Sequence, residues 1–293
     1  ISLSFPRERL EWHYRSRHES LIPFSNNRFY ENSLLTFPSP KEELESVSFK
    51  YVKGEYERGR GINKPEAVEV VKEVVRRLKN KELRNHSIGV VTFNEAQQNI
   101  IEDMLEKELS KNPSLETMPG GEKIFVKNLE NVQGDERDVV LFSVTYGPDK
   151  EKRVSLNFGP LSQKKGERRL NVAVSRAREE MVVFSSIKPE EIMAERAKNM
   201  GASYLRDFLL FAQKGVDVLA NRNLNDMGDE PLSIASFLKN DLEALGFVVK
   251  ENLGSSTFKI DLAIASKENP TDYVLGVIID NKKNCGLTCR DRH

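Results

Sequence analysis

Cysteine is nearly absent from the 293-residue sequence, which contains only Cys285 and Cys289, both close to the carboxyl terminus. Two thiols without further ligands nearby exclude a disulfide framework and do not make a zinc site. Long apolar runs are absent too: no stretch approaches the roughly 18 residues that a membrane-spanning helix needs, and no signal peptide is visible. We therefore expect a cytoplasmic protein that does not contact a membrane.

The sequence also lacks a net charge of either sign. Its 45 lysine and arginine residues balance 45 aspartate and glutamate residues, so no overall field draws in nucleic acid. Phosphate binding must therefore come from local groups of basic side chains. Such groups occur at Arg15 and Arg17, at Arg58 and Arg60, and at Lys164, Lys165, Arg168 and Arg169.

Two motifs of nucleotide hydrolysis are missing as well. The sequence contains neither the G-x-x-x-x-G-K-[ST] phosphate loop nor an acidic D-E-x-x strand that could hold magnesium. An ATP hydrolase needs both a phosphate cradle and a magnesium carboxylate. The first residue is Ile1 rather than methionine. We expect the chain to be a piece of a longer polypeptide whose phosphate loop lies outside it.

Apolar runs of strand length alternate with stretches of helical period along most of the sequence. The predicted strands are 47–52, 88–93, 124–126, 139–145 and 181–185, and the predicted helices begin at Asn63, Asn94 and Gly166. Such alternation predicts an α/β domain whose parallel sheet is covered by helices on both faces. We assign residues 1–200 to this domain. Because ligands of such sheets bind at the carboxyl ends of the strands, we expect Thr92, 133–136 and 143–145 to lie there.

The helix predicted at 166–178, GERRLNVAVSRAR, carries two arginines on one face. Arg169 and Arg176 are seven residues apart, with small and apolar residues such as Ala173 and Val174 between them. A solvated basic face is the simpler interpretation, but these small residues argue against it. An arginine at the end of a helix that packs on a sheet can instead stabilise charge on a transferring phosphoryl group.

Several motifs resemble those of superfamily 1B helicases, the group that includes the nonsense-mediated-decay helicase. RRLNVAVSRAR resembles motif VI, NVQGDERDVVLFS at 131–143 resembles motif V, and HYRS at 13–16 resembles motif IV. GVVTFNEAQ at 89–97 is similar to the family's GIITPYxAQ, with Phe93 and Asn94 in place of Pro-Tyr. The motifs occur in the family's order, which implies that residues 1–200 form the second RecA-like motor domain of such a helicase.

The resemblance also implies roles for individual residues. Arg15 and Arg176 would act as arginine fingers on the nucleotide phosphates. Gln133, Gly134, Glu136 and Arg169 would bind the nucleotide, with Glu136 at the sugar, and Thr92, Gln97, Ser143 and Thr145 would contact the nucleic-acid backbone. The residues themselves leave simpler roles open, because Arg15 could pair with Glu11 or Glu19, Thr92 could cap a helix, and Glu136 could face water.

Cofactors and partners follow from the same resemblance. ATP and Mg²⁺ are implied for the intact protein. The implied partners are nucleic acid, with DNA as the expected kind, and the first RecA-like domain of the same polypeptide. The resemblance further implies movement in the 5′ to 3′ direction, for which composition offers no sign.

The last part of the chain has a different pattern. Residues 201–230 are interpreted as a helical and polar linker, and 231–293 as a smaller α/β domain in which a helix precedes a β-meander. The strands KIDLAI and YVLGVIIDNKK resemble those of a restriction-endonuclease-like domain, related to very-short-patch-repair endonucleases and the PD-(D/E)xK class. This resemblance implies a nuclease fold.

Phosphodiester hydrolysis requires carboxylates that hold Mg²⁺ and a lysine near the attacking water. Asp261 matches the family's first carboxylate, but Ile278 replaces its glutamate. Strand alternation puts Asp280 and Lys282 on the same face as Ile278, so Asp261, Asp280 and Lys282 could form a Mg²⁺ site. The alternative is an inert domain kept for binding or scaffolding.

Three functions follow in order of preference. The first is the C-terminal part of an ATP-dependent superfamily 1 helicase with an appended nuclease-fold domain. The second is a nucleic-acid-binding or scaffolding module without catalysis, and the third is a metal-dependent nuclease.

The missing phosphate loop makes one prediction at once. We expect the purified 293-residue chain to hydrolyse no ATP above the background of a buffer control, because nothing in it cradles the β- and γ-phosphates. Phosphate release with and without single-stranded DNA measures this. A substantial rate from the chain alone would overturn its assignment as a second motor domain.

Overall fold

The computed structural model describes residues 11–40, 46–115, 122–197, 200–222 and 234–279. The chain divides into two compact units. The larger unit comprises Arg15–Glu31 and Glu45–Asn221, and the smaller unit comprises Ile1–Tyr14, Asn32–Leu44 and Arg222–His293. None of the helices within the described ranges is both long and apolar enough to cross a membrane.

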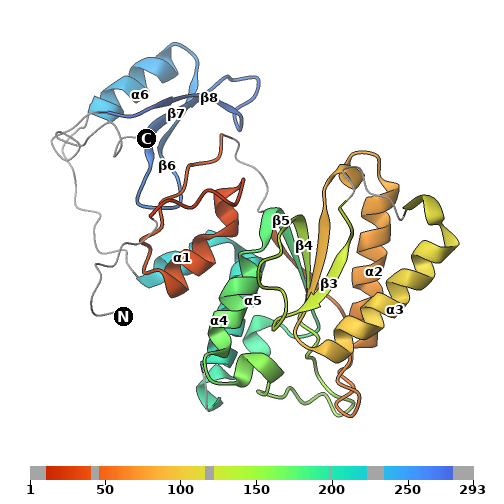
Figure 1. The fold of residues 1–293 in the computed structure, drawn as a ribbon. Helices are drawn as coiled ribbons and strands as arrows, with labels where there is room; N and C mark the ends of the chain where they lie inside the picture. The colour runs from red at the N-terminus through yellow and green to blue at the C-terminus, as the bar shows by residue number, and fades with distance from the viewer. Residues whose placement is uncertain (1–10, 41–45, 116–121, 198–199, 223–233, 280–293) are drawn as a thin grey trace, which may run out of the picture. The chain divides into compact units, whose positions relative to one another are not determined.

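A five-stranded sheet forms the centre of the larger unit (Figure 1). Its strands are β1 (Val47–Tyr51), β2 (Ile88–Thr92), β3 (Phe125–Asn128), β4 (Arg137–Ser143) and β5 (Ala177–Ser185). They lie in the order β1-β5-β4-β2-β3, and every neighbouring pair is parallel. The predicted parallel sheet is therefore confirmed.

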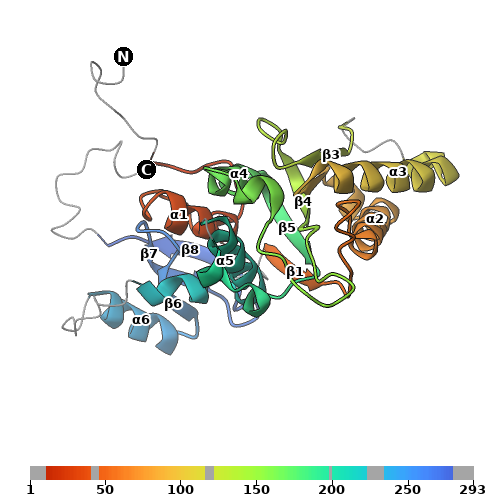
Figure 2. The ribbon, with the colours of Figure 1, turned by 90° about the horizontal axis from the view of Figure 1, so that it is seen from below.

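Helices cover both faces of this sheet (Figures 1 and 2). The helices α2 (Lys64–Lys79) and α3 (Glu95–Lys111) pack on one face, and α1 (Pro23–Phe29), α4 (Gly166–Val174) and α5 (Gly201–Lys214) pack on the other. Strand β4 illustrates the two-sided packing, because its successive side chains point to opposite faces of the sheet and enter the hydrophobic core on each face. Leu141 packs in the α2–α3 core and Phe142 in the opposite one.

The helices α2 and α3 both begin at an asparagine that follows an extended segment. The Asn63 side chain accepts a hydrogen bond from the Glu66 amide, and the Asn94 side chain accepts one from the Gln97 amide. Such caps satisfy amides that have no partner within the helix. The cap predicted at Asn63 is present, and the two caps fix where these helices start relative to the ends of the strands.

Helix α5 differs from its expected place in a linker at 201–230. Leu205, Phe208 and Leu209 are fully buried and pack with the core residues beneath α4. The apolar side of α5 therefore covers part of one face of the sheet. The larger unit accordingly extends to residue 221, whereas the expected domain ended at residue 200.

The smaller unit contains α6 (Ile234–Ala244) and an antiparallel sheet of β6 (Val248–Leu253), β7 (Ile260–Ala265) and β8 (Tyr273–Val277). The sequence pattern predicted this helix followed by a meander. Residues from the beginning of the chain, such as Trp12, also belong to this smaller unit. The expected domain at 1–200 had placed them with the five-stranded sheet. Trp12 stacks on Phe37 at 4.6 Å between ring centroids, and the Thr36 amide donates to Ser256 Oγ at 3.1 Å.

Candidate functional site

All strands of a parallel sheet begin at one edge and end at the other, so the larger unit has an amino edge and a carboxyl edge. Glu136 directly precedes β4 and Arg176 directly precedes β5, so both lie at the amino edge. Thr92 ends β2 and Ser143 ends β4, at the carboxyl edge. The expectation that 133–136 lies at carboxyl ends is wrong for Glu136. The loop after β3 must return across the sheet before a parallel β4 can start.

Arginine side chains converge on Glu136 at the amino edge. Arg15 Nε lies 3.0 Å from one carboxylate oxygen of Glu136, and Arg178 Nε lies 3.3 Å from the other. Arg15 and Glu136 are both partly exposed, with about two fifths of each side chain accessible. The predicted residues Arg15 and Glu136, which are far apart in the sequence, are therefore brought together where an anion from solvent can reach them.

Arg176 is held beside this cluster by its main-chain contacts. Its Nε donates to the Val172 carbonyl oxygen at 2.7 Å, one turn back in the chain, and its Nη1 lies 3.5 Å from the Asp135 carbonyl oxygen. Burial lowers the pKa of Arg176 below its ordinary value, and the positive charge of Arg15 lowers it further, while Glu136 acts in the opposite direction. Two guanidiniums thus lie close enough to repel each other, an arrangement that a bound anion would relieve.

The other residues predicted to bind nucleotide lie outside these contacts. Arg169 Nη1 donates to the Pro160 carbonyl oxygen at 3.1 Å, and its Nη2 lies 3.6 Å from Glu130. Gln133 is exposed in the turn before β4, and Gly134 there has a φ of +95°, which favours glycine. The nucleotide-binding roles of Arg169, Gln133 and Gly134 stay predictions.

The side chains predicted to grip nucleic acid are fully buried at the carboxyl edge. Thr92, Gln97, Ser143 and Thr145 expose none of their surface. The Thr92 hydroxyl donates to the carbonyl oxygen of Asn94, the cap residue of α3, at 2.8 Å. This contact agrees with the simpler interpretation that Thr92 supports the start of a helix. Gln97 Nε2 donates to Ser143 Oγ at 3.1 Å. A phosphate could contact these side chains only by displacing such bonds, so their nucleic-acid role stays a prediction.

A buried carboxyl group, Glu66, holds this network together. It accepts hydrogen bonds from the Ser143 hydroxyl at 2.7 Å and from the Thr145 amide at 2.6 Å, and the Ser186 hydroxyl donates to its other oxygen at 3.3 Å. One side chain of α2 therefore connects the residues that follow β4 and β5. Thr145 has a φ of +71°, which is costly for a β-branched residue and requires support of this kind.

The environment of Glu66 controls its protonation. Burial raises the pKa of this carboxyl group to about 7, although hydrogen bonds from Thr145, Ser143 and Ser186 act to lower it. Sequence reasoning did not single out Glu66. The available signal was its position three residues after the cap at Asn63, where a glutamate usually reaches back toward the cap. Here the Asn63 side-chain amide donates to Glu66 at 3.5 Å, and the Asn63 main-chain amide donates to Gln97.

The smaller unit provides only part of the predicted metal site. The Asp261 carboxylate accepts a hydrogen bond from the Ile279 amide at 2.6 Å, and Ile278 is half exposed. Asp280 and Lys282 lie outside the described residues. Within the described part of the chain, no three histidine, cysteine, aspartate or glutamate side chains are grouped so that they could hold a metal ion.

Comparison with known proteins adds a family. Residues 4–188 match the AAA domain family. The "Uncharacterized ATP-dependent helicase MG140 homolog" of Mycoplasma pneumoniae is 30% identical over 89% of this chain and 24% of its own length. Its counterpart from Mycoplasma genitalium is 28% identical over 85% of this chain and 23% of its own length. The chain thus spans about a quarter of the length of these curated relatives.

More distant similarities are found in yeast and among solved structures. The DNA polymerase alpha-associated DNA helicase A of Saccharomyces cerevisiae is 25% identical over 65% of this chain and 22% of its own length. A crystal structure of the C-terminal domain of a possible DNA helicase from Lactobacillus aligns with 59% of this chain, and the alignment includes 86% of the crystallised chain. At 13% identity and a TM-score of 0.34, it adds nothing to the assignment.

The sheet, its covering helices and the matched relatives define a helicase-type α/β domain. The chain belongs to the AAA domain family.

Glu66 makes the carboxyl edge sensitive to pH. Because the pKa is raised to about 7 in the folded protein from an ordinary value of 4.5, the folded state favours the protonated form. Its contribution to stability is complete below pH 4.5 and is lost as the pH rises through about 7. We expect the free energy of unfolding to fall over this range by at most about 3 kcal/mol.

Two substitutions separate charge from hydrogen bonding. Glu66→Gln keeps an acceptor for Thr145 and should flatten the pH dependence, whereas Glu66→Ala should destabilise the protein by roughly 2–4 kcal/mol at pH 5 and by less at pH 8, where the ionised wild-type group has already lost its contribution. Urea unfolding between pH 5 and pH 8 measures both, with the exposed Glu102→Gln as control. The same pH slope in wild type and Glu66→Gln would show that Glu66 does not titrate in this range.

Proposed function

We propose that the chain is the second motor domain of an ATP-dependent nucleic-acid helicase, and that Arg15 and Arg176 act on the nucleotide phosphates. The observation that carries the proposal is the convergence of Arg15, Arg176 and Arg178 around Glu136 at the amino edge. Two further points support it: the printed names of the matched relatives are those of helicases, and the chain lacks a phosphate loop of its own.

The cluster suggests how these residues would work. Glu136 neutralises part of the positive charge while no anion is present, which lets the guanidiniums stay close together. Arg176 is anchored through Nε, and its two Nη groups make only long contacts, to the Asp135 carbonyl oxygen at 3.5 Å and to Ser175 Oγ at 3.4 Å. An incoming phosphate would replace these contacts with little loss of side-chain freedom. Mg²⁺-bound ATP, held by a phosphate-loop domain, would supply the phosphoryl group whose charge the guanidiniums stabilise.

The carboxyl edge is proposed as the nucleic-acid side. Its network of Glu66, Gln97 and Ser143 is buried, so we propose that these side chains hold the strand ends in place and that a strand contacts groups around them. DNA is the expected substrate, because the more distant yeast relative is called a DNA helicase. Movement in the 5′ to 3′ direction is proposed from the motif resemblance alone.

For the smaller unit we propose a nuclease-like fold without nuclease activity, kept for binding or scaffolding. Asp261 is bonded to a main-chain amide, and Ile278 replaces the carboxylate that would complete a metal site. The supporting point is chemical: hydrolysis of a phosphodiester needs at least one further carboxylate on the metal.

Arg176 tests the motor function. In the complete natural polypeptide that contains this chain, we expect Arg176→Ala to lower the ATPase kcat by about 10³-fold, the usual loss for an arginine finger. Nucleotide affinity should change little, because the guanidinium acts mainly on the transition state. Steady-state ATPase and binding of a fluorescent ATP analogue measure the two effects.

The matched control is Arg168→Ala, an exposed arginine of α4, the helix that ends two residues before Arg176. It should keep the wild-type ATPase rate. Equal rates for both variants would contradict the proposed role of Arg176. Strand binding by a wild-type polypeptide that never hydrolyses ATP would favour the binding module instead.

The smaller unit has its own test. We expect the chain to leave supercoiled plasmid and single-stranded DNA intact in Mg²⁺ or Mn²⁺, with the same result for Asp261→Asn, because Asp261 serves a main-chain contact. Gel electrophoresis of the DNA after incubation measures cleavage. Metal-dependent cleavage by the wild type that disappears in Asp261→Asn would establish an active nuclease and overturn this part of the proposal.

A further inference from the structure

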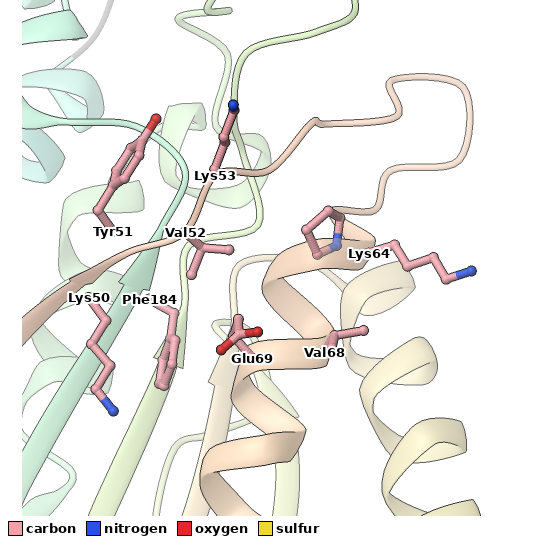
Figure 3. A pocket seen from close by; sticks show the side chains of 9 residues that line it. Lys50, Tyr51, Val52, Lys53, Lys64, Val68, Glu69 and Phe184 are labelled. Atoms are coloured by element: carbon pink, nitrogen blue, oxygen red, sulfur yellow. The ribbon is translucent and has the colours of Figure 1, made fainter.

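A pocket of about 660 Å³ opens beside the end of the edge strand β1 (Figure 3). Residues 50–53 at the end of β1, the first turns of α2, and Phe184 of β5 line it. The lining side chains are Lys50, Tyr51, Val52, Lys53, Lys64, Pro65, Val68, Glu69 and Phe184. The volume falls within the range of small-ligand sites. The pocket lies at the carboxyl edge, because β1 runs parallel to its neighbours.

The charges around the pocket are predominantly positive and unequally compensated. Lys50 Nζ is 3.0 Å from Glu73, and the Glu69 carboxylate is 2.7 Å from Lys72, so these charges are paired. Lys53 and Lys64 are exposed and have no carboxylate within ion-pair distance among the described residues. In Figure 3 both extend outward from the end of the pocket opposite Lys50. Among the described lining residues, Lys53 and Lys64 are therefore the two lysines whose charge no carboxylate offsets, so they can bind an anionic ligand.

The floor between these lysines is apolar and aromatic. Val52 and Phe184 form it and are buried, while α2 contributes Val68 and also Glu69, which lies beside Phe184 and whose carboxylate is paired with Lys72 (Figure 3). On the rim, the exposed ring of Tyr51 lies under a further cation, with Lys188 Nζ 5.2 Å from its centroid. An apolar floor with lysines at its rim matches a nucleotide unit, whose base is flat and apolar on its faces and whose phosphates are anionic.

We propose that this pocket binds one nucleotide unit of a single-stranded nucleic acid, with the base against Val52 and Val68 and the adjoining phosphates at Lys53 and Lys64. The inference rests on the proposed function in one respect, since it takes the carboxyl edge as the nucleic-acid side. It extends the contact region from the ends of β2 and β4 to the end of β1. None of the helicase-like motifs includes these lysines.

The charge part of the proposal is tested by strand binding. The probe is a fluorescein-labelled deoxythymidine strand of about 20 nucleotides, and the 293-residue chain is titrated against it by fluorescence anisotropy at several salt concentrations. We expect the double variant Lys53→Ala, Lys64→Ala to raise Kd roughly tenfold. Losing two phosphate contacts should also lower the slope of log Kd against log salt by about 1.4.

The matched control removes two exposed lysines elsewhere, Lys79 at the end of α2 and Lys107 on α3. Lys79→Ala, Lys107→Ala changes the net charge equally and should leave Kd and the salt slope near the wild-type values. Equal weakening by both double variants would overturn the proposal, because it would reflect overall charge alone. No strand binding by the wild type would overturn both this site and the nucleic-acid side of the proposed function, while leaving the arginine test unaffected.

The base part of the proposal requires a second variant. Val68→Trp fills the pocket without changing any charge, so we expect it to raise Kd roughly tenfold and to leave the salt slope unchanged. Val75→Trp, two turns further along the same helix, is the control for folding and should bind as the wild type does. Wild-type affinity in Val68→Trp would show that no base enters the pocket and would overturn the proposal.

An acidic polypeptide is the competing ligand, and labelled poly-glutamate serves as its probe. We expect it to bind at least tenfold more weakly than the strand at equal salt, because it offers no base to the apolar floor. If poly-glutamate instead bound tightly and lost its affinity in Lys53→Ala, Lys64→Ala while strand binding did not change, the pocket would be a peptide site and the proposal would be wrong.

Discussion

The common direction of five strands governs the chemistry of the larger unit. Because all of them start at one edge, the residues that precede β4 and β5 meet there, and the residues that follow β2 and β4 meet at the other edge. Glu136 and Arg176 thus lie at one edge, where we propose that a nucleotide binds, while Glu66 and Ser143 organise the opposite edge.

Two carboxylates serve these edges in opposite ways. Glu136 is partly exposed and lies among guanidiniums, so it offsets their repulsion and allows the arginines to approach one another. Glu66 is removed from water and receives only neutral donors, so burial raises its pKa to about 7. The first compensates charge where an anion would bind, and the second supports a strained backbone at Thr145. The proposed site at Lys53 and Lys64 adds uncompensated charge beside that supported edge.

Local pattern predicted much of this molecule and failed where distant segments meet. Alternating apolar runs predicted the parallel sheet, and Asn63 correctly predicted the start of α2. Residues 201–230 were expected to be a helical and polar linker, whereas α5 at 201–214 packs in the core of the larger unit. The period of this segment suits an isolated amphipathic helix and a core helix equally well, and only the uncovered sheet face decides between them. The role of Glu66 was not predicted, because a glutamate three residues after a helix cap usually serves the cap alone, and its contacts with Ser143 and Thr145 depend on the packing of α2 against the sheet.

By itself, the sequence determined the order of strands and helices, the helicase-like motifs and the absence of a phosphate loop, because these depend on residue type and spacing along the chain. The tertiary structure decided that Arg15 and Arg176 share one edge with Glu136, and that Trp12 belongs to the smaller unit. Such pairings follow from strand order and from packing between segments that are distant in the chain, and no local spacing encodes them.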